Sequence, residues 1–301
     1  MNKSYSVAVI GLGSMGMGAA ISCINAGLDT YGIDLNPLTL EQLKAAGATG
    51  IGSNGNLFAH KLDAVVILVV NATQANSALF GENGIARYLR KGTPVMVSST
   101  MSAEDAQKIS QKLTELELVM LDAPVSGGAA KAIKGEITIM ASGSQDVFDK
   151  LKPVLDAVAS KVYNIGKDIG LGSTVKIIHQ LLAGVHIAAG AEAMALAARA
   201  NIPLELMYDV VTNAAGNSWM FENRMKHVVD GDYTPLSMVD IFVKDLGLVA
   251  DTAKSLKFPL PLASTAFNMF TEASNAGYGK EDDSAVIKIF NGIDLPKKQE
   301  K

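Results

Sequence analysis

The residues best suited to acid–base chemistry are Lys176, His179 and Gln180, which follow the stretch Gly-Leu-Gly-Ser-Thr-Val (170–175). Their spacing of i, i+3 and i+4 puts all three on one face of a predicted helix. The rest of that helix is apolar, and lysine is seldom buried without a partner. Partial burial would favour the neutral amine, which can take a proton from a substrate hydroxyl. The alternative is a lysine near a helix start whose charged end reaches solvent.

A second candidate is the segment Ser126-Gly127-Gly128, which follows a predicted strand. Two glycines expose consecutive backbone N–H groups and the serine adds a hydroxyl, so the segment could cradle a substrate carboxylate. A flexible turn between strands would explain the same residues equally well. A third candidate, the pair Lys244-Asp245, lies in an apolar helical stretch and could reach into an interdomain cleft. Its alternative is a surface ion pair, which is common and weakly informative.

These side chains need a scaffold, and the scaffold begins with the turn Gly11-Leu12-Gly13-Ser14-Met15-Gly16. An apolar run, Val7 to Ile10, precedes the turn as a predicted strand, and a helix to Ala26 follows it. This order is typical of dinucleotide-binding domains, in which the glycines permit a tight turn, a close approach to a pyrophosphate and tight packing of helix on strand. The start of the helix offers free N–H groups to the phosphates.

Asp34 ends the next predicted strand and selects between the two nicotinamide cofactors. Its carboxylate can accept hydrogen bonds from both hydroxyls of an adenosine ribose and would repel a 2′-phosphate, so the sequence predicts NAD rather than NADP. Asn71 follows the apolar strand Ala64 to Val70, at the sheet edge where ligands of open α/β sheets bind. Thr100 follows the strand predicted at 94–98, where it could touch the cofactor; the alternative for that segment is a helix cap.

The predicted fold class is α/β, with an N-terminal doubly wound sheet of the Rossmann type and a C-terminal all-helical domain. Further strands are predicted at 118–121, 137–141 and 162–165. No strand signal follows Gly166, whereas residues 172–200 form an Ala-rich stretch typical of one long interdomain helix. The predicted domains are therefore an NAD-binding domain, 1–166, and an all-helical substrate and dimerisation domain, 167–301. Shorter helices are expected at 203–214, 218–229, 237–257, 260–276 and 283–290.

Composition narrows the partners that the chain could have. Lys and Arg number 26 against 30 Asp and Glu, a net charge of -4, so nothing favours nucleic acid or an anionic membrane. One cysteine, Cys23, fits a reducing compartment, and with no evident secretory signal the sequence predicts a cytoplasmic enzyme. His60, His186 and His227 lack the spacing of metal ligands, so no metal is expected.

Four pieces of the sequence, taken in order, resemble the β-hydroxyacid dehydrogenase family, which includes 3-hydroxyisobutyrate dehydrogenase. They are Gly-Leu-Gly-Ser-Met-Gly (11–16), Asp-Ala-Pro-Val-Ser-Gly-Gly (122–128), Gly-Leu-Gly-Ser-Thr-Val-Lys (170–176) and Lys-Asp-Leu (244–246). The resemblance implies that Lys176 is the catalytic acid/base and that Ser126, Gly127 and Gly128 hold the substrate carboxylate. It also implies that Lys244 and Thr100 contact the cofactor and that the protein is a homodimer or homotetramer.

The chain departs from many members of this family at His179 and Gln180, where asparagines are common. Together with residues 181–197, these positions resemble the branch that acts on four-carbon sugar acids, and the two side chains could bind the extra hydroxyls of such a substrate. The expected reaction is oxidation of L-threonate at C2 to 2-oxotetronate. The alternatives are reduction of tartronate semialdehyde, oxidation of 3-hydroxyisobutyrate, imine reduction, or a non-catalytic NAD-sensing role.

Overall fold

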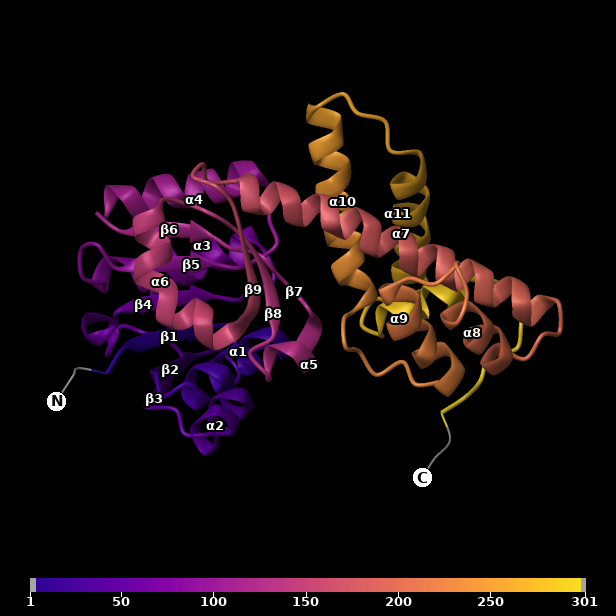
Figure 1. Cartoon of the computed structure of the whole chain (residues 1–301), viewed down its shortest axis with the longest axis horizontal. Coiled ribbons are helices and arrows are strands. Elements are labelled where there is room, and N and C mark those ends of the chain that lie inside the picture. Colours follow the sequence, from indigo (N-terminus) through magenta and orange to yellow (C-terminus); the bar gives the residue numbers. More distant parts are fainter. Residues whose placement is uncertain (1–3, 299–301) are drawn as a thin grey trace. The chain divides into compact units, whose positions relative to one another are not determined.

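The computed structural model describes residues 4–298, and these residues divide into two compact units, the first ending at Lys176 and the second beginning at Ile177. Within the described residues the first unit is an α/β sheet domain and the second is built from helices (Figure 1). The predicted fold class is therefore confirmed.

The described strands of the first unit form one nine-stranded sheet in the order β3-β2-β1-β4-β5-β6-β8-β7, with β9 also paired to β8. The first six in this order run parallel, β6 and β7 pair antiparallel with β8, and β9 runs parallel to it. The strands are β1 Ser6–Ile10, β2 Asp29–Ile33, β3 Gly50–Gly52, β4 Ala64–Ile67, β5 Pro94–Val97, β6 Val119–Asp122, β7 Val125–Ser126, β8 Ile137–Ser142 and β9 Ala159–Gly166.

Helices cover both faces of this sheet (Figure 1). Alternate residues of β1 divide between two apolar cores: Val7 and Val9 face α1, α2 and α6, whereas Ala8 and Ile10 face α3 and α4. Because both faces are covered, the central strands are apolar throughout, as parallel sheets require. The helices are α1 Ser14–Asn25, α2 Pro37–Ala45, α3 Ala72–Phe80, α4 Ala103–Glu115, α5 Gly128–Ala132 and α6 Gln145–Val158, with short 3₁₀ turns at Ala59–Lys61 and Ala86–Tyr88.

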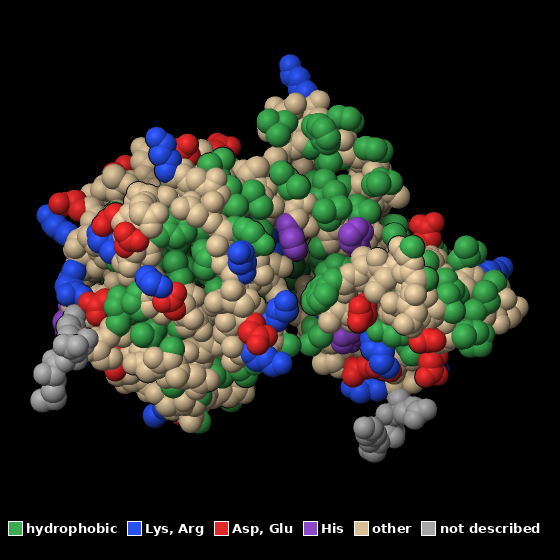
Figure 2. Space-filling model, viewed as in Figure 1, with side chains coloured by type: hydrophobic (Ala, Val, Ile, Leu, Met, Phe, Trp, Pro, Cys, Tyr) green, Lys and Arg blue, Asp and Glu red, His purple; other side chains and the backbone are tan. Residues whose placement is uncertain are grey.

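The second unit packs its helices around a separate apolar core. Gly184 allows close packing there, since a Cβ at this position would lie within 3.1 Å of the Leu246 and Phe242 side chains. At the turn between α10 and α11 apolar side chains reach the surface (Figure 2), and Leu256 is 71% exposed. Helix α7, Leu171–Arg199, begins in the first unit and continues into the second from Ile177. The other elements of the second unit are α8 Leu204–Thr212, α9 Trp219–Asp230, α10 Val239–Ser255, α11 Pro261–Ala273, a π-helical turn η3 Ser274–Tyr278 and a 3₁₀ helix η4 Asp283–Ile289.

Helix α7 is the one element of the described chain that is long and apolar enough to cross a membrane. Half of its most apolar window is buried within the protein, and the central helix of a helical core passes the same test. Length and composition are therefore weak evidence for a membrane span here.

The structure corrects several element boundaries. The strand predicted over 64–70 ends at Ile67, and α3 begins at Ala72. Strands β3 and β7 were missed, since three and two residues are too few to show an alternating pattern. The segment predicted as a helix at 283–290 is a 3₁₀ helix. Met238 and Asp282 form an isolated β-bridge, although no strand signal was found after Gly166.

Candidate active site

The glycine turn has the geometry that its residue types predict. Gly11 has a φ of +89°, and a Cβ there would lie 2.8 Å from the carbonyl oxygen of Leu68. A Cβ on Gly16 would lie 1.7 Å from the carbonyl oxygen of Gly11. Both positions therefore require glycine, one for conformation and close approach and one for the packing of α1 against the turn.

Gly13 differs from these two glycines, because a Cβ at this position would meet no atom within 4 Å. The protein itself gives no steric reason for glycine here, whereas a ligand approaching the backbone would. Gly13 begins α1 without a side-chain cap, and the first turn of α1, which contains Ser14 and Met15, has no acidic residue. The first N–H groups of the helix thus suit an anion, and the turn fits a dinucleotide pyrophosphate.

Asp34 lies directly beside this turn. Its Oδ2 accepts a hydrogen bond from the backbone N–H of Leu12 at 2.6 Å, and its Oδ1 accepts one from Asn36 N–H at 2.8 Å. Two backbone donors therefore fix the orientation of the carboxylate, while each oxygen keeps a lone pair for a ribose hydroxyl. Residues 12 and 34 are distant in the sequence, and the parallel pairing of β1 with β2 brings them close together in space.

Asn71 and Thr100 both follow the carboxyl ends of parallel strands. Asn71 caps α3, since its side chain accepts a hydrogen bond from Gln74 N–H at 2.9 Å. Thr100 lies between β5 and Ser102, which caps α4 by accepting from Asp105 N–H at 3.0 Å. The cap that the sequence offered as the alternative in this segment is thus supplied by Ser102.

The proposed carboxylate cradle begins at the end of β7, in which Ser126 pairs with Thr138 of β8. Gly127 and Gly128 follow with φ values of +136° and +73°. Other residues rarely adopt these conformations, so the turn requires glycine at both positions. Its consecutive N–H groups are the feature that could bind a carboxylate.

Lys176 is 7% exposed and lies one helical turn after the start of α7. That start is held by Asp122, whose Oδ2 accepts from the N–H groups of Gly170 at 3.0 Å and Ser173 at 2.9 Å. Asp122 Oδ1 accepts from the Ser173 hydroxyl at 2.7 Å, and the Ser142 hydroxyl donates to Oδ2 at 3.2 Å. Burial raises the pKa of Asp122, and these hydrogen bonds offset part of that rise.

In the helical unit, His179 and Gln180 belong to a chain of polar contacts. Gln180 Nε2 donates to Asp245 Oδ2 at 2.6 Å, and Gln180 Oε1 lies 3.0 Å from His179 Nδ1. Lys244 Nζ pairs with Asp245 Oδ1 at 2.6 Å. Asp245 is only 2% exposed, so this is a buried pair and not the surface pair that was the alternative.

The sequence did not assign functional roles to Asp122, Ser173 or Asp245, which the structure links to predicted site residues. A signal for Asp122 was available, because one carboxylate ends an apolar strand at the first position of the segment 122–128. Asp245 stood beside Lys244 in the predicted pair, but its contact with Gln180 joins residues 65 positions apart. Among the described residues, no group of three His, Cys, Asp or Glu side chains could hold a metal ion.

Comparison with known proteins identifies the family. Residues 6–166 match the NAD binding domain of 6-phosphogluconate dehydrogenase, and residues 170–290 match the NAD-binding domain of NADP-dependent 3-hydroxyisobutyrate dehydrogenase. The chain belongs to the β-hydroxyacid dehydrogenase family. It is 81% identical to L-threonate dehydrogenase of Haemophilus influenzae, over 99% of each chain. It is 71% identical to L-threonate dehydrogenase of Escherichia coli K12, over 98% of this chain and 97% of the relative.

A solved relative supports the same conclusion. The crystal structure described as 3-hydroxyisobutyrate dehydrogenase from Salmonella typhimurium superposes with a TM-score of 0.93 and is 70% identical. It covers 95% of this chain and all of the relative. The protein is thus an NAD-dependent dehydrogenase that acts on a CH–OH group, as the sequence predicted.

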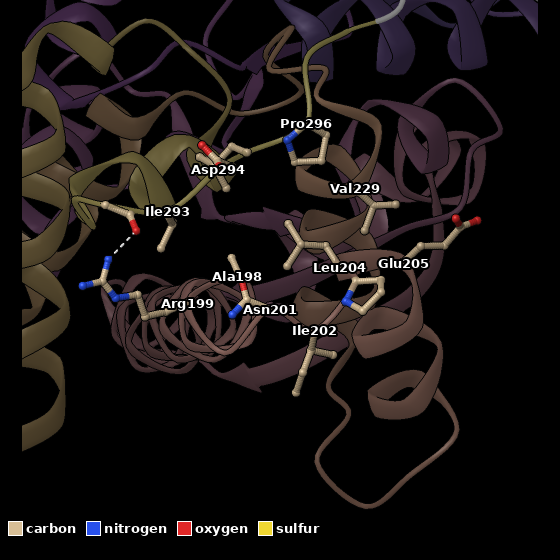
Figure 3. Close-up of a pocket in the computed structure, with 13 residues that line it drawn as sticks. Ala198, Arg199, Asn201, Ile202, Leu204, Glu205, Val229, Ile293, Asp294 and Pro296 are labelled. Atoms are coloured by element: carbon tan, nitrogen blue, oxygen red, sulfur yellow. Dashed lines mark hydrogen bonds between the residues drawn. The ribbon is translucent and has the colours of Figure 1, made fainter.

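The helical unit of this dehydrogenase also has an open pocket of about 780 Å³ at the end of α7, lined by Arg199, Asn201, Leu204, Glu205 and Pro296 among others (Figure 3). Arg199 donates a hydrogen bond to the carbonyl oxygen of Gly292 at its wall. None of the predicted site residues lines this pocket.

Proposed function

We propose that the protein oxidises L-threonate at C2 to 2-oxotetronate, with NAD as the hydride acceptor. The observation that carries this proposal is the buried lysine at the start of α7, followed on the same helix by His179 and Gln180 in place of the asparagines common in the family. Relatives at 71–81% identity that carry the name L-threonate dehydrogenase support the same substrate.

Lys176 is the proposed acid/base. Its neutral Nζ takes the proton of the substrate C2 hydroxyl, and the hydrogen on C2 leaves with its electron pair as hydride. When bound, NAD supplies the acceptor for that hydride. In the reverse direction the Lys176 ammonium returns the proton to the carbonyl oxygen. Oxidation therefore requires the neutral amine, and reduction requires the ammonium.

The cofactor and carboxylate sites orient the reactants. Gly11 to Gly16 and Asp34 would hold the pyrophosphate and ribose, and Thr100, Asn71 and Lys244 would contact the rest of the cofactor. The backbone N–H groups at Gly127 and Gly128, with the Ser126 hydroxyl, would hold the substrate carboxylate. By holding the carboxylate, this anchor would fix the direction of the C2 hydrogen, which is a large part of the rate gain from orientation.

His179 and Gln180 are the proposed readers of the distal hydroxyls. The bond from Gln180 Nε2 to Asp245 fixes which way the amide points, and Gln180 Oε1 therefore faces His179. His179 Nδ1 is then the donor in this contact, and in the tautomer with the hydrogen on Nδ1 the ring Nε2 is an acceptor. An acceptor suits a substrate hydroxyl, and 3-hydroxyisobutyrate has no such distal group.

Substrate profiling tests the assignment. Initial rates of NADH formation are measured with L-threonate, D-threonate, D-erythronate, 3-hydroxyisobutyrate and D-glycerate, each with NAD and with NADP. We expect the highest kcat/KM with L-threonate and NAD. A preference for 3-hydroxyisobutyrate, the name given to the Salmonella relative, would keep the Lys176 chemistry and refute the substrate. Absence of turnover with every acid would favour the NAD-sensing alternative.

The role of Lys176 is tested by Lys176→Ala. We expect kcat to fall about 10²–10⁴-fold, the usual contribution of general acid–base catalysis, with the dissociation constant for NADH changed less than threefold. Lys167→Ala, which removes an exposed lysine of the same unit, is the matched control and should keep the wild-type kcat. Near-normal turnover of Lys176→Ala would show that another group moves the proton.

We also propose a cytoplasmic homodimer or homotetramer. One side of α7 carries an exposed row at heptad spacing that includes Ile178, Leu182 and Leu196, which are 58%, 53% and 69% exposed. Such a row is typical of a helix that packs on another helix, and a second copy of the chain could cover it. Sedimentation equilibrium of the wild type and of Leu182→Glu measures the association: a monomeric wild type would refute the proposal.

A further inference from the structure

We infer that Asp122 is a positioning residue for Lys176: it clamps the first turn of α7 to the edge of the sheet and so sets where the lysine amine stands. The inference rests on the proposed role of Lys176. At the start of a helix the first N–H groups have no partner within the helix and must find one elsewhere.

Acceptors outside the helix bind most of the N–H groups at the start of α7. Ser173 N–H and Gly170 N–H donate to Asp122 Oδ2, and Gly172 N–H donates to the Ser142 hydroxyl at 3.1 Å. The Ser173 hydroxyl donates to the other carboxylate oxygen. Asp122 ends β6 and Ser142 ends β8, so the cap of α7 comes from the sheet and not from the helix's own sequence.

The contact between the start of α7 and the sheet leaves no room for a side chain at Gly172. A Cβ on Gly172 would lie 2.5 Å from the carbonyl oxygen of Met140 and 2.7 Å from that of Asp122. Backbone atoms cannot move aside as the end of a flexible side chain can, so only glycine lets the helix start sit this close to β6 and β8. Hydrogen bonds and packing thus fix one position for the first turn.

Lys176 follows Ser173 by three residues, which is just under one turn of helix at 1.5 Å per residue. The amine therefore moves with the clamped turn. Asp122 is also the first residue of the segment that ends in the proposed carboxylate cradle, Ser126 to Gly128. The short segment 122–128 would then position both the Lys176 amine and the group that binds the substrate carboxylate. An oriented proton transfer requires these two groups to be held at a fixed separation.

Two variants displace the turn by different routes. Asp122→Asn removes the charge and turns one acceptor into a donor, and Gly172→Ala leaves every hydrogen-bonding side chain in place but forces the helix away from the sheet. We expect both to lower kcat with saturating L-threonate and NAD about 10–100-fold, since a displacement of about 1 Å can cost that much. The dissociation constant for NADH should change less than threefold.

Further readouts separate positioning from general destabilisation. The primary isotope effect with C2-deuterated L-threonate should rise in both variants, because the chemical step becomes slower. Ser218→Ala is the control: it removes the cap of α9, which accepts from Phe221 N–H, and should lower Tm without changing kcat.

The outcomes are distinct. A kcat within twofold of wild type in Gly172→Ala and in Ser173→Ala, a milder variant that folds if Asp122→Asn does not, would overturn the inference while Lys176→Ala remained inactive. If Lys176→Ala itself kept its turnover, the proposed function would fail, and the inference would fail with it because the clamp would have no acid/base to place.

Discussion

Asp122 in the sheet unit and Asp283 in the helical unit are both buried carboxylates, but different kinds of partner stabilise them. Asp122 is 1% exposed and accepts its hydrogen bonds from uncharged backbone and hydroxyl donors. Asp283 is fully buried and pairs with a cation, Arg224 Nε, at 2.7 Å. Burial raises the pKa of both groups, that of Asp283 to about 7.

The difference teaches what each carboxylate can control. Uncharged donors on the backbone of another element let Asp122 fix the position of a helix, and that helix carries Lys176. An ion pair between two side chains ties α9 to η4 but holds no predicted site residue. Asp122 variants should therefore change the rate of reaction, whereas variants of the Arg224–Asp283 pair should change stability alone. The following predictions test this division.

The largest effect is expected for Arg224→Met, which leaves the Asp283 carboxylate buried without its cation. Breaking a buried ion pair typically lowers the free energy of unfolding by about 3–5 kcal/mol. At temperatures below the melting temperature of the variant, kcat should stay within twofold of the wild-type value. The loss of folding stability should be larger at pH 8 than at pH 5. Burial raises the pKa of Asp283 to about 7, so its carboxyl is neutral at pH 5 and ionised at pH 8, where it needs the cation. The contribution of this group to the free energy of unfolding is therefore full below about pH 4, the pKa of an unfolded Asp, and is lost as pH rises through 7.

Thermal melts from pH 5 to 8 and kcat measurements check this prediction. Without Arg224 the pKa of Asp283 should rise further, so the Tm difference between wild type and variant should widen toward high pH. A difference independent of pH would mean that the carboxylate stays ionised throughout. A lowered kcat would contradict the division between the two regions.

Asp34 extends the comparison to a carboxylate held by backbone donors but only partly buried. Asp34→Ala should lower kcat/KM for NAD about 100-fold, since charge-assisted bonds to the ribose contribute about 1.5–3 kcal/mol each. Activity with NADP should fall less, because repulsion of the 2′-phosphate is removed. Steady-state kinetics with both cofactors, at saturating L-threonate, measure the ratio. An unchanged ratio would remove Asp34 from cofactor selection.

Asp245 combines the two types of partner, since it accepts from the Gln180 amide and pairs with Lys244. Gln180→Leu leaves the buried carboxylate short of one donor and removes the acceptor beside His179. We expect kcat/KM for L-threonate to fall about 10-fold, because an unmade buried hydrogen bond costs about 1–3 kcal/mol. The value for 3-hydroxyisobutyrate should change less than threefold. Equal losses with both acids would show that Gln180 positions the helix and does not read hydroxyls.

What the sequence could predict follows from how local each contact is. The turn at 11–16 and Asp34 belong to one strand–helix–strand unit, whose residue types and order are sufficient to place them together. Confirmation came from the bond between Leu12 N–H and Asp34. The face shared by Lys176 and Gln180 was equally local, because helical spacing fixes it.

Contacts between distant segments could not be predicted in this way. Asp122 meets Ser173 across 51 positions and Gln180 meets Asp245 across 65, and no spacing within either segment indicates the pairing. The two glycines of β3, Gly50 and Gly52, likewise gave no strand signal, since the strand is held by its pairing with β2 and not by its own propensity.

The smallest effect is expected for Ser142→Ala, at the edge of the Asp122 cluster. The Ser142 hydroxyl donates to Asp122 at 3.2 Å and accepts from Gly172 N–H at 3.1 Å. Both of these hydrogen bonds are long. Without the Ser142 hydroxyl, Asp122 would still accept three shorter hydrogen bonds from Gly170 and Ser173. We expect a loss of about 1 kcal/mol in stability and less than a threefold change in kcat. Denaturant unfolding and steady-state rates test this, and a kcat loss as large as that of Asp122→Asn would move the positioning role from the carboxylate to the hydroxyl.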